Sequence, residues 1–278
     1  RIDHKRSIIP NTVWIYWDSK DIPDFVTSII RFNKMGNSDF NFIILNPETV
    51  FEYIPKVEFH KDLLVAHKAD YIRLVLLEKY GGIWLDATTI LISKLNWIHH
   101  VDDNQFYDLI GYYRDQSTVD YEFPIVETWF LAAAPNNRFI KLWLDEFSNI
   151  IIEGSASFYD KFKHREDFPI IAQKLSDPSY LMINLSEQIV SRSLKNVNMY
   201  LKKCEDSAFY IQEKCEWDFN RISYILCRQR LSLDDFSILK LTSKDRALLK
   251  LYSQFKLIKK SSLLGQILVN DKRIKSVN

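Results

Sequence analysis

The sequence has few of the residues that build the commonest ligand-binding loops. Its 278 residues include 6 Gly and 3 Cys. The glycines form neither a dinucleotide-binding fingerprint nor a Walker phosphate-binding loop, so NAD-binding and P-loop chemistry lose support. Cys204, Cys215 and Cys227 are odd in number and too far apart for a Cys-x-x-Cys metal site. They favour a reducing cytosol over a disulfide framework.

Long apolar runs and a strong net charge are also missing. No apolar run approaches the roughly 18 residues of a membrane-spanning helix, and no signal peptide is visible. The chain begins with Arg1 rather than Met, so removal of an N-terminal anchor stays open. Lys and Arg number 37 against 36 Asp and Glu, and this balance gives no reason to expect a nucleic-acid partner.

The basic residues are concentrated near the C-terminus. Residues 240–278 contain ten Lys or Arg and two Asp. Apolar residues flanked by lysines recur there at helical spacing, namely Leu248, Leu251, Tyr252, Phe255 and Ile258. This basic amphipathic pattern suggests a cytoplasmic protein in peripheral contact with an anionic membrane at its inner face. A solvated helix end, or docking of the stripe on the protein body, stays open.

The apolar pattern predicts an α/β fold. Strands are expected over 12–17, 41–45, 82–92, 106–113 and 125–134, and helices over 22–35, 61–80 and 139–152. Asp21 is the expected N-cap of the first helix, and 95–100 is an expected connection. Residues 157–230 are predicted to be rich in helix. We therefore expect a single domain with a Rossmann-like, nucleotide-binding core over 1–152 and a helical part with the basic tail over 153–278.

Two charged residues interrupt the predicted helix 61–80. Asp70 and Arg73 fall opposite a strip of lysines, at about 100° per residue, that consists of Lys61, Lys68 and Lys79. The lysine strip is the natural water side, so the acid and the arginine should point into the protein. A buried ionised pair is costly unless each charge is compensated. It could tie the helix to the sheet, or form a polar wall for a polyhydroxylated ligand.

Asp86 favours the ligand interpretation. It follows Ile83-Trp84-Leu85, near the C-terminal end of an apolar strand. Open α/β sheets place their ligands at that end of their strands.

These residues carry a family resemblance. Residues 69–73 (Ala-Asp-Tyr-Ile-Arg), 79–86 (Lys-Tyr-Gly-Gly-Ile-Trp-Leu-Asp) and 87–89 (Ala-Thr-Thr) resemble the core of DXD-type sugar transferases. They are most similar to the capsular polysaccharide synthesis protein family. The α-mannosyl- and α-galactosyltransferases and the glucosyltransferase domains of clostridial toxins are more distant relatives. The resemblance implies a GT-A-like fold. One position departs from the pattern, because Thr88 stands where the motif has its second Asp.

The resemblance also implies a function. It points to a retaining hexosyltransferase that moves a sugar from a nucleotide-sugar donor, with UDP favoured, to a growing bacterial capsular or other surface glycan, lipid-linked or free. Asp70 and Arg73 would hold the sugar hydroxyls. Asp86 would bind the metal, the ribose or both. Mn²⁺ or Mg²⁺ is the implied cofactor, with Asp86 and Thr88 as its protein ligands.

Further donor contacts follow from the resemblance. An aromatic strand after a Pro opens the nucleotide pocket in the related families, which makes Trp14, Tyr16 and Trp17 candidates for stacking on the base. Trp17 is the best placed, because it closes the strand. Residues 239–244 resemble the family's C-terminal Lys-Leu-Thr element, so Lys240 would meet the diphosphate charge, and Thr242 or Ser243 would donate hydroxyl bonds.

Glu127 is a candidate sugar or acceptor contact, because its segment faces the acceptor in the resembled family. A plain surface acid is the alternative.

Two other functions stay open at this point. The missing second Asp suits a catalytically reduced nucleotide-binding subunit of a polysaccharide assembly complex. A phosphosugar transferase would release a nucleoside monophosphate in place of a diphosphate.

Overall fold

The computed structural model describes residues 8–102, 105–194 and 196–268. The chain divides into two compact units. The first consists of Arg1–Lys20, Asn41–Leu85 and Asn96–Lys203, and the second of Asp21–Phe40, Asp86–Leu95 and Cys204–Asn278. The predicted division at residue 152 does not coincide with this partition, because later residues contribute helices and a strand to the first unit.

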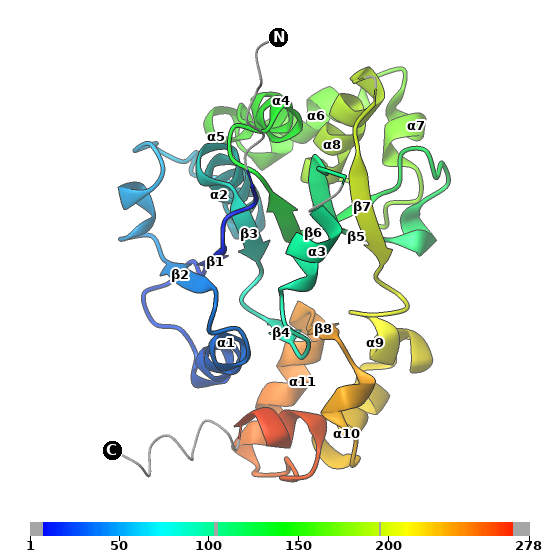
Figure 1. The fold of residues 1–278 in the computed structure, drawn as a ribbon. Coiled ribbons are helices and arrows are strands. Elements are labelled where there is room, and N and C mark those ends of the chain that lie inside the picture. Colours follow the sequence, from blue (N-terminus) through cyan, green and yellow to red (C-terminus); the bar gives the residue numbers. More distant parts are fainter. Residues whose placement is uncertain (1–7, 103–104, 195, 269–278) are drawn as a thin grey trace. The chain divides into compact units, whose positions relative to one another are not determined.

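The first unit is built on a six-stranded sheet with the order β2-β1-β3-β6-β5-β7 (Figure 1). Its strands are β1 (Thr12–Tyr16), β2 (Asn41–Leu45), β3 (Gly82–Leu85), β5 (Leu109–Tyr113), β6 (Val126–Ala133) and β7 (Met199–Lys203). β1 runs parallel to β2 and β3, β6 is antiparallel to β3 and β5, and β7 is parallel to β5. The sheet is therefore mixed, and the predicted α/β class is confirmed. β7 has no counterpart among the predicted strands.

Helices cover this sheet. They are α2 (Val65–Tyr80), α3 (Trp97–Asp102), α4 (Arg138–Phe147), α5 (Ile150–Glu153), α6 (Ser155–Lys163), α7 (Phe168–Ala172) and α8 (Met182–Ser193). Short 3-10 turns occur at η1 (Val50–Glu52) and η2 (Asp115–Ser117). α2 packs against β3 and α4, and α4 packs against α8. Every residue of α2 from 70 to 77 is buried, so this helix belongs to the core and has no wide solvent face.

Two glycines form the sharp turn from α2 to β3. Gly81 and Gly82 have φ angles of 62° and 98°, a region that side chains with a Cβ rarely adopt. A Cβ on Gly81 would lie 2.5 Å from the backbone nitrogen of Pro135, and one on Gly82 would lie 2.5 Å from the carbonyl oxygen of Thr12. The predicted helix end at these glycines is confirmed.

The second unit contains a small antiparallel sheet of β4 (Thr89–Leu91) and β8 (Ile238–Lys240). Its helices are α1 (Asp24–Gly36), α9 (Tyr210–Lys214), α10 (Phe219–Arg228) and α11 (Ser243–Gln254), with a 3-10 turn η3 (Leu233–Asp235). Asn33 on α1 fastens β4, because its amide donates to the carbonyl oxygen of Thr89 (2.8 Å) and accepts from the backbone nitrogen of Leu91 (2.8 Å).

Several predicted boundaries were wrong. The strand expected over 82–92 is two strands, β3 and β4, in different sheets, because the chain turns at Asp86. α2 begins at Val65 rather than residue 61, and α1 begins at Asp24 with Pro23 in place of Asp21 as N-cap. The expected connection 95–100 contains most of α3, and the helix expected over 139–152 is divided between α4 and α5. Among the described residues, no helix is long and apolar enough to cross a membrane.

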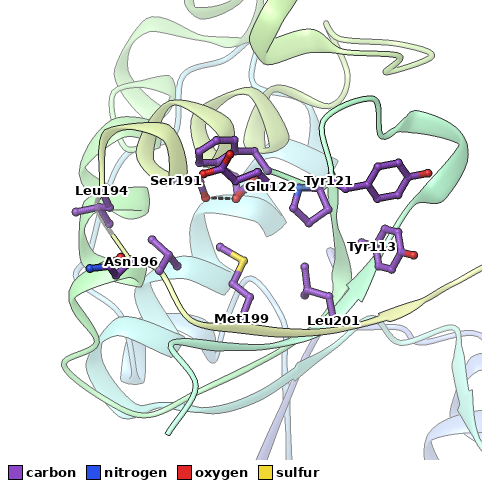
Figure 2. Close-up of a pocket in the computed structure, with 12 residues that line it drawn as sticks. Tyr113, Tyr121, Glu122, Ser191, Leu194, Asn196, Met199 and Leu201 are labelled. Atoms are coloured by element: carbon purple, nitrogen blue, oxygen red, sulfur yellow. Dashed lines mark hydrogen bonds between the residues drawn. The ribbon is translucent and has the colours of Figure 1, made fainter. Parts of the chain in front are cut away.

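A cavity of about 740 Å³ lies beside α8 in the first unit. Figure 2 shows Ser191 of α8 on one side of it and Met199 and Leu201 of β7 on the other. Glu187, also on α8, is 1% exposed and accepts hydrogen bonds from the Ser191 hydroxyl and from the Gln188 amide (2.9 Å). Burial raises the pKa of Glu187 to about 7.

This buried carboxyl should make the stability of the fold depend on pH. Its folded-state pKa is above the ordinary value of 4.5, so its contribution is full below pH 4.5 and is lost as pH rises through about 7. The neutral amide of Glu187→Gln resembles the protonated carboxyl. We therefore expect the free energy of unfolding of this variant to fall by about 3 kcal/mol less than that of the wild type as pH rises. The measurement is urea denaturation at about pH 5 and about pH 8.

Glu122→Gln is the matched control, because Glu122 lines the same cavity but is exposed. A Glu187→Gln protein whose stability falls with pH as steeply as that of the wild type would contradict the assignment.

Candidate active site

The first unit holds a buried ion pair on α2. Arg73 donates to the Asp70 carboxylate one helical turn earlier, and the two residues are 4% and 7% exposed. The centre of the Arg73 guanidinium lies 4.8 Å from the centre of the Trp84 ring on β3. The prediction that Asp70 and Arg73 point into the protein is confirmed. The aromatic face and the carboxylate together compensate a charge that burial alone would disfavour.

A second polar group lies where β1 ends. The Tyr16 hydroxyl donates to Oδ1 of Asp18 (2.5 Å), and Nζ of Lys68 lies 3.0 Å from the same oxygen. Burial, with the Asp18 carboxylate beside it, raises the pKa of Tyr16, so this phenol stays a neutral donor. Lys68 is half-buried, which corrects its placement on an open lysine strip; Lys61 and Lys79 are exposed as predicted.

Asp18 and its contact with Lys68 were not predicted from the sequence. The position of Asp18 directly after an aromatic strand was the available signal, because the carboxyl ends of parallel strands collect polar side chains.

The three aromatic candidates of β1 have different environments. Trp14 is 3% exposed, its ring packs against Tyr53 and Tyr80, and its indole nitrogen donates to the Gly81 carbonyl oxygen (2.8 Å). This placement is at odds with base stacking by Trp14, because protein atoms already cover the ring. Tyr16 is also buried, whereas Trp17 follows the strand and is half-buried. Of the three, Trp17 has the surface that a base would need.

Glu127 lies on β6, where it pairs with Tyr112 of β5 and is half-buried. Its prediction as a sugar or acceptor contact stays a prediction.

The second unit holds a cluster of opposite charges around Asp86, the residue that follows β3 in the chain. The ammonium of Lys240 donates to Oδ2 of Asp86 (2.7 Å). The side chain of Lys240 is 11% exposed and that of Asp86 is 30% exposed. Pairing of β4 with β8 sets Thr89 opposite Lys240, and this register joins two segments about 150 residues apart. The cluster therefore depends on a strand pair that the sequence analysis did not predict.

Thr88 lies inside this cluster and is 3% exposed. Its hydroxyl donates to the Leu241 carbonyl oxygen (3.0 Å) and accepts from Lys240 (3.4 Å) and from the Arg246 guanidinium (3.3 Å). Arg246, which lies one turn into α11, was not among the predicted site residues. Two cationic side chains thus contact the Asp86 carboxylate and the Thr88 hydroxyl.

The two hydroxyl candidates at the start of α11 also differ. Thr242 is the N-cap, and its hydroxyl forms a capping box with Asp245, donating to the carboxylate (2.9 Å) and accepting from the backbone nitrogen (3.3 Å). This placement is at odds with a donor role for Thr242, because its hydroxyl proton is already engaged. Ser243 is exposed at the first helical position.

The residues present do not fit a resident divalent cation. Mn²⁺ and Mg²⁺ prefer carboxylate, phosphate and water oxygens. Asp86 contributes one carboxylate, which an ammonium already contacts, and the Thr88 oxygen receives hydrogen bonds from two cationic side chains. In the parts of the chain that the structure describes, no three His, Cys, Asp or Glu residues are arranged to hold a metal. Asp86 and Thr88, the expected metal ligands, are instead contacted by cationic side chains, and their role toward a metal stays a prediction.

Known glycosyltransferases share part of this sequence. It is 33% identical over 104 residues to the O-glycosyltransferase braB of Annulohypoxylon truncatum, covering 35% of this chain and 23% of that protein. It is 22% identical over 157 residues to the O-glycosyltransferase PaGT of Phomopsis amygdali, covering 50% of this chain and 38% of that protein. The chain thus spans less than half the length of the curated relatives that it matches.

Solved structures resemble the chain more loosely. The PaToxG glycosyltransferase has a TM-score of 0.37 and 16% identity, over 66% of this chain and 78% of that one. A glycosyltransferase involved in the glycosylation of the major capsid of PBCV-1 has a TM-score of 0.43 and 9% identity, over 84% and 95%. Both TM-scores are below 0.5, so the family assignment rests on sequence.

A family-wide sequence comparison covers more of the chain than either curated relative. The sequence profile described as capsular polysaccharide synthesis protein matches residues 2–210. That range includes β1, the whole of α2, and β3 with Asp86 and Thr88. Because the match spans most of its length, the chain belongs to the capsular polysaccharide synthesis protein family.

Proposed function

We propose that this protein is a glycosyltransferase. It moves a sugar from a nucleotide-sugar donor, with a UDP-sugar favoured, to a growing capsular or other surface glycan. Family membership and the names of the curated relatives support this proposal. The observation that carries it is the pair of cationic side chains, Lys240 and Arg246, that contact Asp86 and Thr88.

The chemistry of the cluster matches the hardest part of the reaction. When the bond between the anomeric carbon and the diphosphate breaks, negative charge accumulates on the leaving phosphate. Fixed cations in a partly dry site stabilise that charge without reorganising. Lys240 is suited to this role, because it is mostly buried and Asp86 holds its ammonium at a defined position. The guanidinium of Arg246, bonded to Thr88, supplies a second cation.

The proton balance then needs no further protein base. In a retaining, front-face path, the anomeric carbon bonds to the acceptor oxygen on the face that the phosphate leaves. The acceptor hydroxyl gives its proton to the departing phosphate oxygen. Lys240 and Arg246 share the charge that remains on the diphosphate.

Asp70 and Arg73 are the proposed contacts to the sugar hydroxyls. A carboxylate accepts hydrogen bonds and a guanidinium donates them. The pair can therefore accept from one hydroxyl of a vicinal diol and donate to the other. Their ion pair and the contact with Trp84 hold both groups in place before a ligand arrives.

The two cationic side chains around Thr88 also support a side-chain cation mechanism at the diphosphate. Lys240 and Arg246 occupy the surroundings of Thr88, where the second Asp of a DXD motif would otherwise support a metal. A nucleotide-binding subunit without activity stays an alternative, and so does a phosphosugar transferase.

Replacement of Lys240 should distinguish these functions. Incubation with a panel of UDP- and GDP-sugars is expected to release a nucleoside diphosphate, and Lys240→Met is expected to slow this release about a hundredfold or more. Lys244→Ala is the matched control, because Lys244 is exposed on the same segment. Release of a monophosphate would identify the phosphosugar transferase, and nucleotide binding without turnover would identify the inactive subunit.

Removal of either member of the buried pair should affect turnover more than nucleotide affinity. Asp70→Asn and Arg73→Ala are each expected to slow turnover about tenfold or more, because they alter sugar contacts and leave the base contacts intact. Each change also leaves a buried charge without its partner, at a cost of about 3–5 kcal/mol, so the free energy of unfolding is measured alongside. Lys79→Ala, exposed on the same helix, is the control. A folded Asp70→Asn protein with wild-type turnover would show that the pair is purely structural.

Chelation tests the role of the metal. We expect donor turnover to persist in excess EDTA, and calorimetry of the nucleotide-free protein with Mn²⁺ to give no saturable heat, because one ion-paired carboxylate is a poor site. Thr88→Asp serves as the contrast, since a second carboxylate should create measurable Mn²⁺ binding. Turnover that requires Mn²⁺, together with Mn²⁺ binding that Asp86→Ala abolishes, would contradict this inference.

A further inference from the structure

The C-terminal end of α11 exposes three large apolar side chains. Leu251, Phe255 and Leu257 are 46%, 71% and 45% exposed. Leu251 and Phe255 lie four residues apart, and thus on one face, and Leu257 lies in the turn that follows. An exposed apolar group of this kind commonly marks an interaction surface.

A different face of α11 packs onto its own unit. Leu249 is fully buried in the core of the second unit, and Tyr252 and Ile258 pack partly against the same core. The predicted apolar stripe is therefore divided between two roles. Docking on the protein body accounts for Tyr252 and Ile258, but leaves Leu251 and Phe255 exposed.

The surroundings of the exposed group are basic. Four exposed lysines lie within residues 250–260, namely Lys250, Lys256, Lys259 and Lys260. No Asp or Glu occurs between residues 246 and 268, and α10, which packs along α11, also contains none. Lys272, Arg273 and Lys275, which also belong to the predicted basic tail, lie outside the described residues. Exposed apolar side chains with exposed lysines close by in the chain match the interface of an anionic bilayer, where phosphates lie above hydrocarbon.

The turn after α11 puts a lysine where glycine is favoured. The backbone nitrogen of Leu257 donates to the Tyr252 carbonyl oxygen (2.8 Å), and that of Lys256 donates to Ser253 (3.1 Å), which is a Schellman motif. Lys256 has a φ of 56°, a left-handed conformation that disfavours residues other than glycine. The left-handed backbone of Lys256 is locally strained, and its side chain places a cation between Phe255 and Leu257 in the chain.

Contacts from α10 hold this turn in position. The Arg228 guanidinium donates to the Leu257 carbonyl oxygen (2.9 Å), and the backbone nitrogen of Lys259 donates to the Cys227 carbonyl oxygen (2.9 Å). The exposed side chains are therefore displayed by an ordered turn, which lowers the entropy lost on binding.

We propose that residues 250–260 form a membrane-docking tip. Leu251, Phe255 and Leu257 insert at the headgroup level of an anionic bilayer, and the four lysines bind its phosphates. The tip lies within the second unit and includes none of the proposed catalytic residues, so the inference does not depend on the proposed function.

Vesicle sedimentation of the full chain tests the proposal without any donor. We expect the protein to bind vesicles of phosphatidylcholine with about one third phosphatidylglycerol at least tenfold more tightly than phosphatidylcholine alone. Added salt should weaken the binding, because it screens the lysines. Equal binding to both vesicles, or binding to neither, would overturn the proposal. If the protein turns over a donor but does not bind vesicles, only the membrane-docking inference is overturned. If it binds vesicles but turns over no donor, only the proposed function is weakened.

Two variants separate the contribution of apolar insertion to vesicle binding from the contribution of charge. Phe255→Ser should weaken vesicle binding about tenfold through the loss of apolar burial. Lys256→Gly should weaken it about fivefold through the loss of one cation, while its melting temperature stays the same or rises because glycine suits the turn. Ile152→Ser is the control, since Ile152 is 72% exposed in the first unit and should not contribute. Wild-type binding by both tip variants would refute the docking tip.

Discussion

Burial of α2 is the constraint on which the first unit depends. Each residue from 70 to 77 is enclosed, so every charge on that stretch must be compensated inside the fold. Asp70 and the face of Trp84 do this for Arg73. The double-glycine turn makes the contact possible, because it returns the chain from α2 directly into β3. A polar pair with a fixed geometry is thus built into the core, and the proposed sugar contact uses groups that the fold already has to order.

The second unit contains the other group of interacting charges, around Asp86. Its small sheet brings Asp86 and Thr88 to Lys240 and Arg246. In a DXD site two carboxylates attract a metal, and the metal attracts the diphosphate. Here a neutral threonine replaces the second carboxylate, and side-chain cations stand around it. In the proposed site, these side-chain cations would meet the diphosphate at this position.

The two ends of α11 have separate roles. Its first turn contributes Arg246 to the charged cluster, while its last turn and the following residues expose Phe255 and Leu257 between lysines. The buried face, with Leu249, fixes the helix in its unit, so both ends are presented by one rigid element.

Local pattern in the sequence determined much of this protein. The aromatic strand β1, the helix stop at Gly81, the burial of Asp70 and Arg73 and the family of the chain follow from periodicity, turn chemistry and one extended motif. The tertiary structure alone decided which distant groups meet. Lys240 contacts Asp86 because β4 and β8 pair over three residues on each side. Lys68, expected in solvent, contacts Asp18. Tyr53 and Tyr80 cover the ring of Trp14, which leaves it no face for a base. The physical reason is that periodicity reports which face of an element is buried, whereas the partner of a buried charge or ring is set by long-range pairing that leaves no local pattern.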